Sequence, residues 1–480
     1  MITSAASVAT SAPLYPPTVK PPAQPLATLP FLLRFIDNPL LTLPAAAYHE
    51  PMLVIRRPGR TAAWIISPAL IEELLIKRSD ELSKSQIERR VFRHSLGKGV
   101  LIAEGQDWRW QRRAMAPLFR PADVMGYVPA FGRAADAMLA EWRRTADPVI
   151  RPIDDDMTTI TFDVITSTML AGIEPDEAIT MKRATHQLLD KSSWEVGFTL
   201  VGFPEWLWHP AKRQMRASGA ELRAVVDRII ARYRTANAAT GGAASGDLLG
   251  HLMAARDPDT GTVMTDERLI DNLLTLLEAG HETTAKALTW TLYLLARAPE
   301  WQARVREEVA SVAGSGPIEA AHLARLVVTT QVIKEAMRLY PPAPVIGRAT
   351  LAEMKIANVT LPAGSMIVVP IYALHRHRKL WDDPDRFDPE RFAPEREKAI
   401  PRTQYMPFGA GARVCIGAQF AMAEAIAILA TLVRGARFDW DGHHLPEPVS
   451  RVTLRAKGGM PLTVTAYKSL RRAGAKPLHP

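Results

Sequence analysis

The chain has 480 residues and a formal charge of +9, with 47% hydrophobic and 23% charged residues. Such a composition is typical of a globular protein and argues against a disordered or fibrous one. The single cysteine, Cys415, excludes an intramolecular disulfide, a cysteine-rich zinc site and an iron–sulfur cluster. No dense run of Lys and Arg with interleaved aromatic residues occurs, so nucleic-acid binding is not expected.

The N-terminus is rich in proline, and residues 1–50 are predicted to be an extended lead. Residues 51–470 are expected to form the main domain, and residues 471–480 a basic tail. No basic segment precedes an apolar run near the N-terminus, and no apolar run approaches the ~20 residues of a membrane span. We therefore expect a cytoplasmic protein without a transmembrane segment.

The predicted elements begin with a hairpin over 54–66 that turns at Pro58-Gly59. Helical periodicity then dominates the chain. The predicted helices cover 105–118, 122–145, 155–171, 176–192, 216–236 and 265–298, and a further one ends at Tyr340. Strands are expected near 354–361 and 366–370, an irregular stretch over 381–412, a helix from 417 to 433 and strand-like alternation over 452–467. The fold class is mainly α with a small β portion, in one large domain.

The surroundings of Cys415 point to a metal-ligating thiolate. A glycine-rich loop lets backbone amides approach the sulfur, and the helix that follows favours negative charge through its dipole. The segment 408–417 resembles the haem-binding signature Phe-x-x-Gly-x-Arg-x-Cys-x-Gly of the cytochrome P-450 superfamily. The matching residues are Phe408, Gly411, Arg413, Cys415 and Gly417. This resemblance implies haem b between the long helix 265–298 and the cysteine loop, with Cys415 as the axial ligand of the iron.

A second motif, Ala-Gly-His-Glu-Thr-Thr over 279–284, lies in the middle of the long predicted helix. From the residues alone it predicts either a kink beside a polar pocket or a widened helix that leaves room for dioxygen. The resemblance favours the second interpretation and places Ala279 against the haem. It also implies that Glu282 and Thr283 deliver protons during oxygen activation. For His281 we expect a structural role.

A third pair, Glu335 and Arg338, is spaced so that both side chains share one helical face. By similarity to the family, Arg391 completes a structural network that supports the cysteine loop.

The remaining cofactor contacts concern the haem propionates. Trp108 and Arg112 are four residues apart, so their N–H groups lie on one helical face and suit a carboxylate. The resemblance makes them propionate ligands, together with Arg413 and Arg348. An ordinary core Trp and surface Arg would show the same spacing.

The resemblance implies a haem-thiolate monooxygenase that inserts one atom of dioxygen into a C–H bond of a lipophilic substrate. Electrons would come from NAD(P)H through a ferredoxin or flavodoxin and its reductase, because the chain carries no dinucleotide fingerprint or cysteine cluster. A basic face could dock an acidic partner. Its candidate residues are Arg109, Arg112, Arg113 and Arg402. A peroxide-using peroxygenase and a haem sensor without turnover are the alternatives, and the motif at 279–284 argues against both.

The substrate is the least determined feature. Details of the motifs favour fatty acids, fatty alcohols or alkanes, with a steroid or terpenoid as the alternative. Expected substrate contacts are Thr275, Val345, Ile346 and Met460. A substrate carboxylate could meet Arg89, Arg90 or Arg93. Five aromatic residues over 194–208 either line an access channel, touch a membrane surface or pack within helices.

Overall fold

The computed structural model describes residues 12–57, 60–93, 95–145, 148–169, 173–239, 248–257 and 259–467. The helices are α1 (Thr28–Asp37), α2 (Pro68–Glu72), α3 (Gln86–Phe92), α4 (Gly105–Met115), α5 (Pro121–Trp142), α6 (Ile153–Met169), α7 (Pro175–Val201), α8 (Lys212–Ala239), α9 (Leu248–Ala254), α10 (Asp266–Arg297), α11 (Pro299–Ala313), α12 (Ala320–Leu323), α13 (Val327–Leu339), α14 (Ile371–Leu374), α15 (Pro394–Glu397) and α16 (Ala418–Gly435). The strands are β1 (Met52–Arg57), β2 (Arg60–Ile65), β3 (Leu82–Lys84), β4 (Val149–Pro152), β5 (Ile346–Thr350), β6 (Met354–Ile356), β7 (Val359–Leu361), β8 (Met366–Val369), β9 (Ala436–Asp439), β10 (Glu447–Ser450), β11 (Leu454–Lys457) and β12 (Pro461–Ala466).

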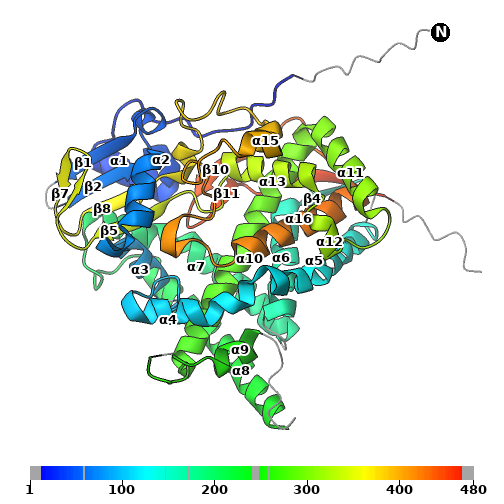
Figure 1. The fold of residues 1–480 in the computed structure, drawn as a ribbon, viewed down its shortest axis with the longest axis horizontal. Coiled ribbons are helices and arrows are strands. Elements are labelled where there is room, and N and C mark those ends of the chain that lie inside the picture. Colours follow the sequence, from blue (N-terminus) through cyan, green and yellow to red (C-terminus); the bar gives the residue numbers. More distant parts are fainter. Residues whose placement is uncertain are drawn as a thin grey trace, which may run out of the picture.

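Helix α10 crosses the middle of the molecule and packs against α6, α8, α13 and α16 (Figure 1). Its 32 residues span roughly 50 Å. Thr265 caps its N-terminus by accepting a hydrogen bond from the Arg268 amide, and two acidic residues follow in the first turn. Pro299 begins α11 and cannot continue α10. The long helix expected over 265–298 is therefore confirmed.

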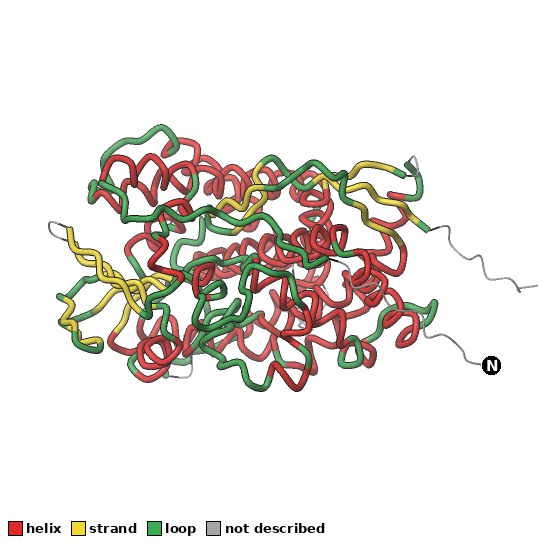
Figure 2. The backbone as a smooth tube through the Cα atoms, turned by 90° about the horizontal axis from the view of Figure 1, so that it is seen from above, coloured by secondary structure: helices red, strands yellow, loops and turns green. Residues whose placement is uncertain are grey.

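A five-stranded sheet lies at one end of the molecule, in the strand order β1-β2-β8-β5-β3 (Figure 2). Strands β2 and β8 pair in parallel and the other neighbours are antiparallel. The predicted hairpin forms β1 and β2, whereas its turn at Pro58-Gly59 lies outside the described residues. With 57% helix and 12% strand, the mainly α fold class with a small β portion is confirmed.

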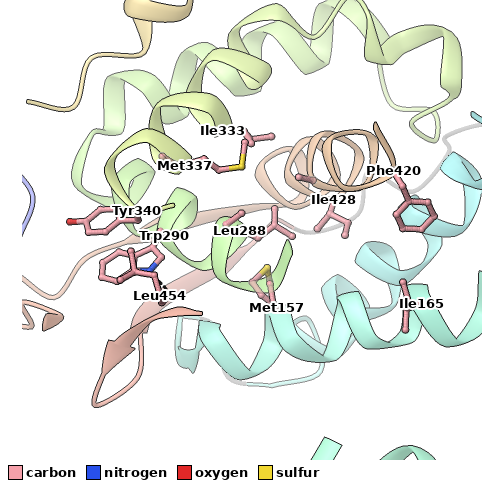
Figure 3. Close-up of a cluster of buried hydrophobic side chains, with 14 of the residues drawn as sticks. Met157, Ile165, Leu288, Trp290, Ile333, Met337, Tyr340, Phe420, Ile428 and Leu454 are labelled. Carbon is pink, nitrogen blue, oxygen red and sulfur yellow. Dashed lines mark hydrogen bonds between the residues drawn. The ribbon is translucent and has the colours of Figure 1, made fainter. Parts of the chain in front are cut away.

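The core is built around α10, α13 and α16 (Figure 3). The rings of Trp290 and Tyr340 stack with centroids 3.7 Å apart, and the indole N–H of Trp290 donates to the carbonyl of Leu454 at 3.4 Å. Leu288 and Ile428 are fully buried between the same helices. By length and composition α16 could cross a membrane, but 72% of it is buried inside the molecule, as expected of a core helix.

The first described residues form a strap on the main body rather than a separate lead. Phe387 donates its N–H to the carbonyl of Leu14 at 2.9 Å, and the Tyr340 hydroxyl donates to the carbonyl of Pro17 at 2.7 Å. The side chain of Val19 is buried. The chain from residue 12 onward therefore packs on the main domain, and residue 50 does not mark a structural boundary. The local sequence pattern predicts only an extended segment, because the order of this proline-rich stretch comes from tertiary contacts. The tail 471–480 lies outside the described residues.

Candidate active site

The cysteine loop is held by backbone geometry that only glycine permits. Gly411 has a φ of +73°, and a Cβ there would lie 1.8 Å from the carbonyl oxygen of Leu75. The Cys415 amide donates to the carbonyl of Phe408 at 2.9 Å and closes the loop. Gly417 then forms the N-cap of α16. The signature residues therefore shape a tight turn that presents one sulfur atom.

The thiol of Cys415 faces an internal space. Its side chain is accessible to solvent, yet burial raises its pKa, against the lowering effects of the Gly417 N–H and Arg112. Both observations hold for a sulfur that points into a space enclosed by protein. The Gly417 amide lowers the pKa of Cys415, which is the direction that the sequence predicts, but desolvation outweighs this effect. A bound metal ion deprotonates a coordinating thiol outright, so the site suits a metal ligand better than a free nucleophile.

The long helix α10 also has side chains that no other described part of the protein covers. Within the buried run of α10, Ala279 is exposed and Thr283 is half-buried. These residues are four apart and share one face. Gly280, by contrast, is needed for packing, because a Cβ there would lie 2.6 Å from the Cδ1 atom of Ile165 on α6. The helix is continuous through this motif. The room for dioxygen therefore has to lie at Ala279 and Thr283, not at Gly280.

Glu282 and Thr283 are not aimed at the same place. The Thr283 hydroxyl donates to the carbonyl of Ala279 at 2.7 Å. The buried Glu282 carboxylate accepts hydrogen bonds from the Thr453 hydroxyl and the Arg455 Nε atom, both at 3.0 Å. Despite the burial, which raises it, the pKa of Glu282 is lowered to about 2, chiefly by Lys286 and Arg455. Glu282 is therefore an ionised acceptor at neutral pH, not a proton donor.

His281 has the structural role that the sequence predicts. Its Nδ1 atom lies 2.7 Å from the carbonyl of Leu277, and its ring packs edge-on against Phe162 of α6. Burial lowers its pKa, so it is a neutral packing residue.

The residues predicted to hold propionates gather beside the cysteine loop. The Arg413 guanidinium lies 4.1 Å from the ring centroid of Trp108 and donates to Glu104 at 2.8 Å. Arg348 is buried, with Glu88 at 4.0 Å. In the part of the chain that is described, the side chain of Arg112 makes no hydrogen bond or ion pair. Burial lowers its pKa and Cys415 raises it.

This arrangement fits a large planar dianion. Thr283 of α10 and Phe408 of the cysteine loop line one cavity, and the Cys415 thiol is exposed. The Arg112 guanidinium interacts electrostatically with Cys415 and has no hydrogen-bond or ion-pair partner among the described residues, so it suits a carboxylate. The residues present therefore fit haem b, with Cys415 as the iron ligand and Arg112 as the freest propionate donor. Because Arg112 faces this space, it does not belong to the exposed basic face with Arg109 and Arg113, which pair with Asp80 and Asp259.

The predicted supporting network is present. Arg338 forms two hydrogen bonds with the Glu335 carboxylate at 2.7 and 2.8 Å, and both side chains are fully buried. Arg391 approaches the same carboxylate at 3.5 Å. Arg338 also donates to the carbonyls of His375 and Pro384 at 2.8 Å each. The network thereby ties α13 to the segment that leads to the cysteine loop.

Sequence reasoning missed His375 as part of this support. Its Nε2 atom accepts the amide of Met406 at 3.0 Å. Burial, together with Arg338 and Arg376, lowers its pKa to about 3 and keeps the ring neutral. His375 follows directly after α14 as its C-cap, and no sequence signal marked this contact.

The predicted substrate contacts are scattered. Val345 is 49% exposed, Ile346 is half-buried, and the hydroxyl of Thr275 donates to its own helix at 2.7 Å. Met460 is fully buried, with its amide bonded to Asp154 of α6 at 2.9 Å, so its assignment as a substrate contact is wrong. The turn that reaches α10 is instead 451–453, between β10 and β11, as the bond from Thr453 to Glu282 shows. No local pattern in the sequence marks this contact, because it joins residues 171 positions apart.

The basic residues proposed for a substrate carboxylate are mostly engaged. Arg90 is buried and donates to Glu195 at 2.8 Å, and Arg93 pairs with Glu205. Arg89 remains exposed. Two of the three candidates are already neutralised by protein carboxylates, which leaves Arg89 as the exposed candidate for a substrate carboxylate.

The aromatic segment 194–208 divides into two sets. Phe198 packs against Phe203 and His209, and Trp194 stacks on His209. Trp206 and Trp208 are 80% and 68% exposed. The first set packs internally, although Phe203 is 40% exposed, and the second set presents most of the apolar surface of this segment to the outside.

Comparison with known proteins identifies the family of the chain. The family model for cytochrome P-450 matches residues 30–460. Cyclooctatin synthase from Streptomyces melanosporofaciens is 31% identical over 448 residues, covering 93% of each chain. Cyclooctat-9-en-7-ol 5-monooxygenase from the same organism is 32% identical over 400 residues, covering 82% of this chain and 84% of that one. Cytokinin hydroxylase from Arabidopsis thaliana is 32% identical over 406 residues, covering 82% of this chain and 76% of that one. The chain belongs to the cytochrome P-450 family, and it is a monooxygenase of that family.

Proposed function

We propose that this protein hydroxylates a lipophilic, cyclic substrate of the terpenoid type, with electrons from NAD(P)H delivered by a separate ferredoxin or flavodoxin. The observation that carries the proposal is the space between Cys415 and the uncovered face of α10 at Ala279 and Thr283. When bound there, haem would supply the activation of dioxygen. The chain's own residues supply the ligand, the substrate walls and the proton transfers.

Within this site Thr283 positions a proton near the oxygen-binding face. Its hydroxyl is anchored to the Ala279 carbonyl, which leaves the oxygen lone pairs free to accept from water or ligand. Glu282 holds no proton at neutral pH, since Lys286 and Arg455 stabilise its charge. It accepts hydrogen bonds from Thr453 and Arg455 and thereby orders the polar group on that side of the helix. The pair therefore acts from two sides of the helix.

The proposed substrate class follows from two observations. The relatives carry names such as cyclooctat-9-en-7-ol 5-monooxygenase and cytokinin hydroxylase, and none of those cited is named for a fatty acid. Two of the three arginines that might have met a carboxylate are paired with Glu195 and Glu205. The steroid or terpenoid alternative of the sequence analysis is therefore preferred to fatty acids, fatty alcohols and alkanes.

A spectral titration tests this class. Haem-loaded protein is titrated with cedrol, progesterone, trans-zeatin, dodecanoic acid and dodecane while the spin-state change of the haem is recorded. We expect a saturable shift with the cyclic compounds and at least tenfold weaker binding of the two linear ones. A saturable shift with dodecanoic acid alone would contradict the proposal.

The role of Thr283 is tested by Thr283→Ala. Loss of the hydroxyl should leave NAD(P)H consumption within about threefold of wild type but lower product per NAD(P)H about tenfold, a cost of ~1.4 kcal/mol in proton delivery. The control is Thr291→Val on the same helix, whose buried hydroxyl also bonds only to its own backbone. Electrons are supplied by a ferredoxin with its reductase and, in parallel, by a flavodoxin. Unchanged coupling in Thr283→Ala, or reduction by neither donor, would count against the mechanism.

A further inference from the structure

A groove outside the active site lies between α4 and the short helix α9 (Figure 1). Its volume is about 440 Å³, which is within the range of about 300–1,000 Å³ that small-molecule sites occupy. In the described part of the chain, it shares no lining residue with the cavity at Thr283 and Phe408. On each helix the lining residues are three or four apart and therefore share one face of it. They are Trp110, Arg113 and Ala114 on α4, and His251 and Ala254 on α9.

Most of the lining is apolar, and one buried member carries an unused hydrogen-bond donor. Besides the two alanines, the apolar surface comes from Pro117, Leu118 and Ala255. Trp110 is 3% exposed, and its indole N–H has no acceptor among the described residues. An indole N–H can only donate, and buried donors without an acceptor are few in native structures. A ligand in the groove that carries an acceptor would give this donor a partner.

The polar members of the lining are basic. Arg113 and Arg256 are both exposed, and no acidic side chain lines the groove in the described part of the chain. Arg113 approaches Asp259 at 3.7 Å, but both side chains of this pair are more than half exposed, so the pair is weak. Arg256 donates to a backbone carbonyl at 3.3 Å, and Asp107 of α4 is neutralised by Arg268 at 2.8 Å. The groove therefore offers an anion two guanidinium groups, with little competition from carboxylates of the chain.

We propose that the groove between α4 and α9 binds a small amphipathic anion, that is, a carboxylate or sulfonate attached to an apolar ring system. The anionic group lies between Arg113 and Arg256 and accepts the N–H of Trp110, while the ring system packs on the alanines. A small molecule suits a groove of this volume better than a protein partner, because a stable protein interface buries about 1,600 Å² in total. Arg112 is turned roughly 200° from Trp110 on α4, so the ligand lies on the side of the helix away from the cofactor space. The site is additional to the one for the substrate.

Isothermal titration calorimetry of the haem-loaded protein tests the site, with 2-naphthalenesulfonate as the probe and uncharged 2-naphthol as its matched analogue. We expect one saturable site for the sulfonate and at least tenfold weaker binding of 2-naphthol. Arg113→Gln and Ala254→Trp should each weaken sulfonate binding at least fivefold, because one removes a cation and the other fills the groove. Trp110→Phe, which loses only the N–H donor and part of the ring, should weaken it about threefold. The control is Arg109→Gln, since Arg109 is an exposed residue of α4 that does not line the groove; this variant should bind as wild type does.

The haem absorption spectrum is recorded in the same titration and should not change, because the ligand lies away from the cofactor space. A spin-state shift with the same Kd as the heat signal would place the sulfonate at the haem and overturn the proposal. Equal affinity for the two probes, or an unchanged Kd in any of the three groove variants, would overturn it as well. Displacement of the sulfonate by an acidic ferredoxin would make the groove a protein interface and also contradict the proposal. None of these results bears on the substrate titration, so the proposed function is tested separately.

Discussion

Two buried glutamates on neighbouring helices differ in protonation state: one is ionised and the other is neutral at pH 7. Glu282 is ionised because Lys286 and Arg455 surround it. Glu424 of α16 has no cation beside it, and burial raises its pKa to about 8 against a small effect of Thr284. Depth in the molecule alone therefore does not decide protonation here. What decides it is whether a positive side chain comes with the carboxyl group.

Glu424 makes the protein less stable as the pH rises. Its folded-state pKa of about 8 exceeds the unfolded value of 4.5, so the folded state retains a proton that the unfolded chain releases. Stability falls between pH 4.5 and 8 by on the order of 1 kcal/mol per pH unit from this group. We expect Glu424→Gln to flatten that slope and to be more stable than wild type at pH 8. Urea denaturation at pH 6 and pH 8 measures it.

A matched control for this measurement is Glu395→Gln, since that side chain is 85% exposed and pairs only with Lys398. Its slope should equal that of wild type. Burial also raises the pKa of Glu278 on α10, which contributes a slope of the same sign, so the Glu424 variant should retain part of the pH dependence. A variant with the full wild-type slope would show that Glu424 is ionised in the folded protein.

At the scale of elements, the junction between α13 and the segment before the cysteine loop depends on one ion pair. Arg338→Ala would leave Glu335 charged, buried and facing only Arg391. The expected loss is about 3–5 kcal/mol, together with a haem content well below one per chain. Arg304→Gln is the control, because Arg304 and Glu390 form an exposed pair worth at most ~1 kcal/mol. Full haem occupancy in Arg338→Ala would refute the supporting role.

Features of these elements that depend on residues close together in the sequence could be predicted, whereas features that depend on tertiary contacts could not. The cysteine loop, the motif on α10 and the Glu335–Arg338 spacing are contiguous, so their geometry follows from helix period and glycine positions. The contact of Thr453 with Glu282 joins residues 171 positions apart. No periodicity encodes such a contact. For the same reason Met460 was misassigned.

The sequence also does not show which partner a charged side chain has. From the sequence, Arg90 was as good a carboxylate receptor as Arg89, and only the fold reveals Glu195 beside it. Arg112 had two predicted roles, and its position next to Cys415 decides between them. Charge counts predict how many groups need partners. They do not say which ones the protein itself provides.

At the scale of the whole molecule, the N-terminal strap joins the first described residues to the region before the cysteine loop. The Tyr15 hydroxyl donates to Asp383 at 2.8 Å, and the Val19 amide donates to the Tyr372 hydroxyl at 3.3 Å. Removing residues 1–20 should lower the free energy of unfolding by on the order of 2–4 kcal/mol, since buried hydrogen bonds and Val19 are lost. Chemical denaturation measures the change.

A truncation that removes only residues 1–11 keeps all of these contacts and serves as the control. It should match the full chain in stability. Equal stability of both truncations would mean that the strap contributes nothing to the folded state.

The hydrogen bonds that close the cofactor space can form only late in synthesis of the chain. Arg413 donates to the Ala103 carbonyl and to Glu104, about 310 positions earlier in the chain. A ribosome adding about 5–20 residues per second needs roughly 15–60 s to cover that interval. Within this interval α10 is complete at Arg297, whereas α16, which covers one of its apolar sides, is complete only at Gly435, 138 residues later. At the same rate newly made chains spend about 7–28 s with that apolar surface uncovered, and the yield of folded protein depends on keeping the chains apart until the last fifth has emerged.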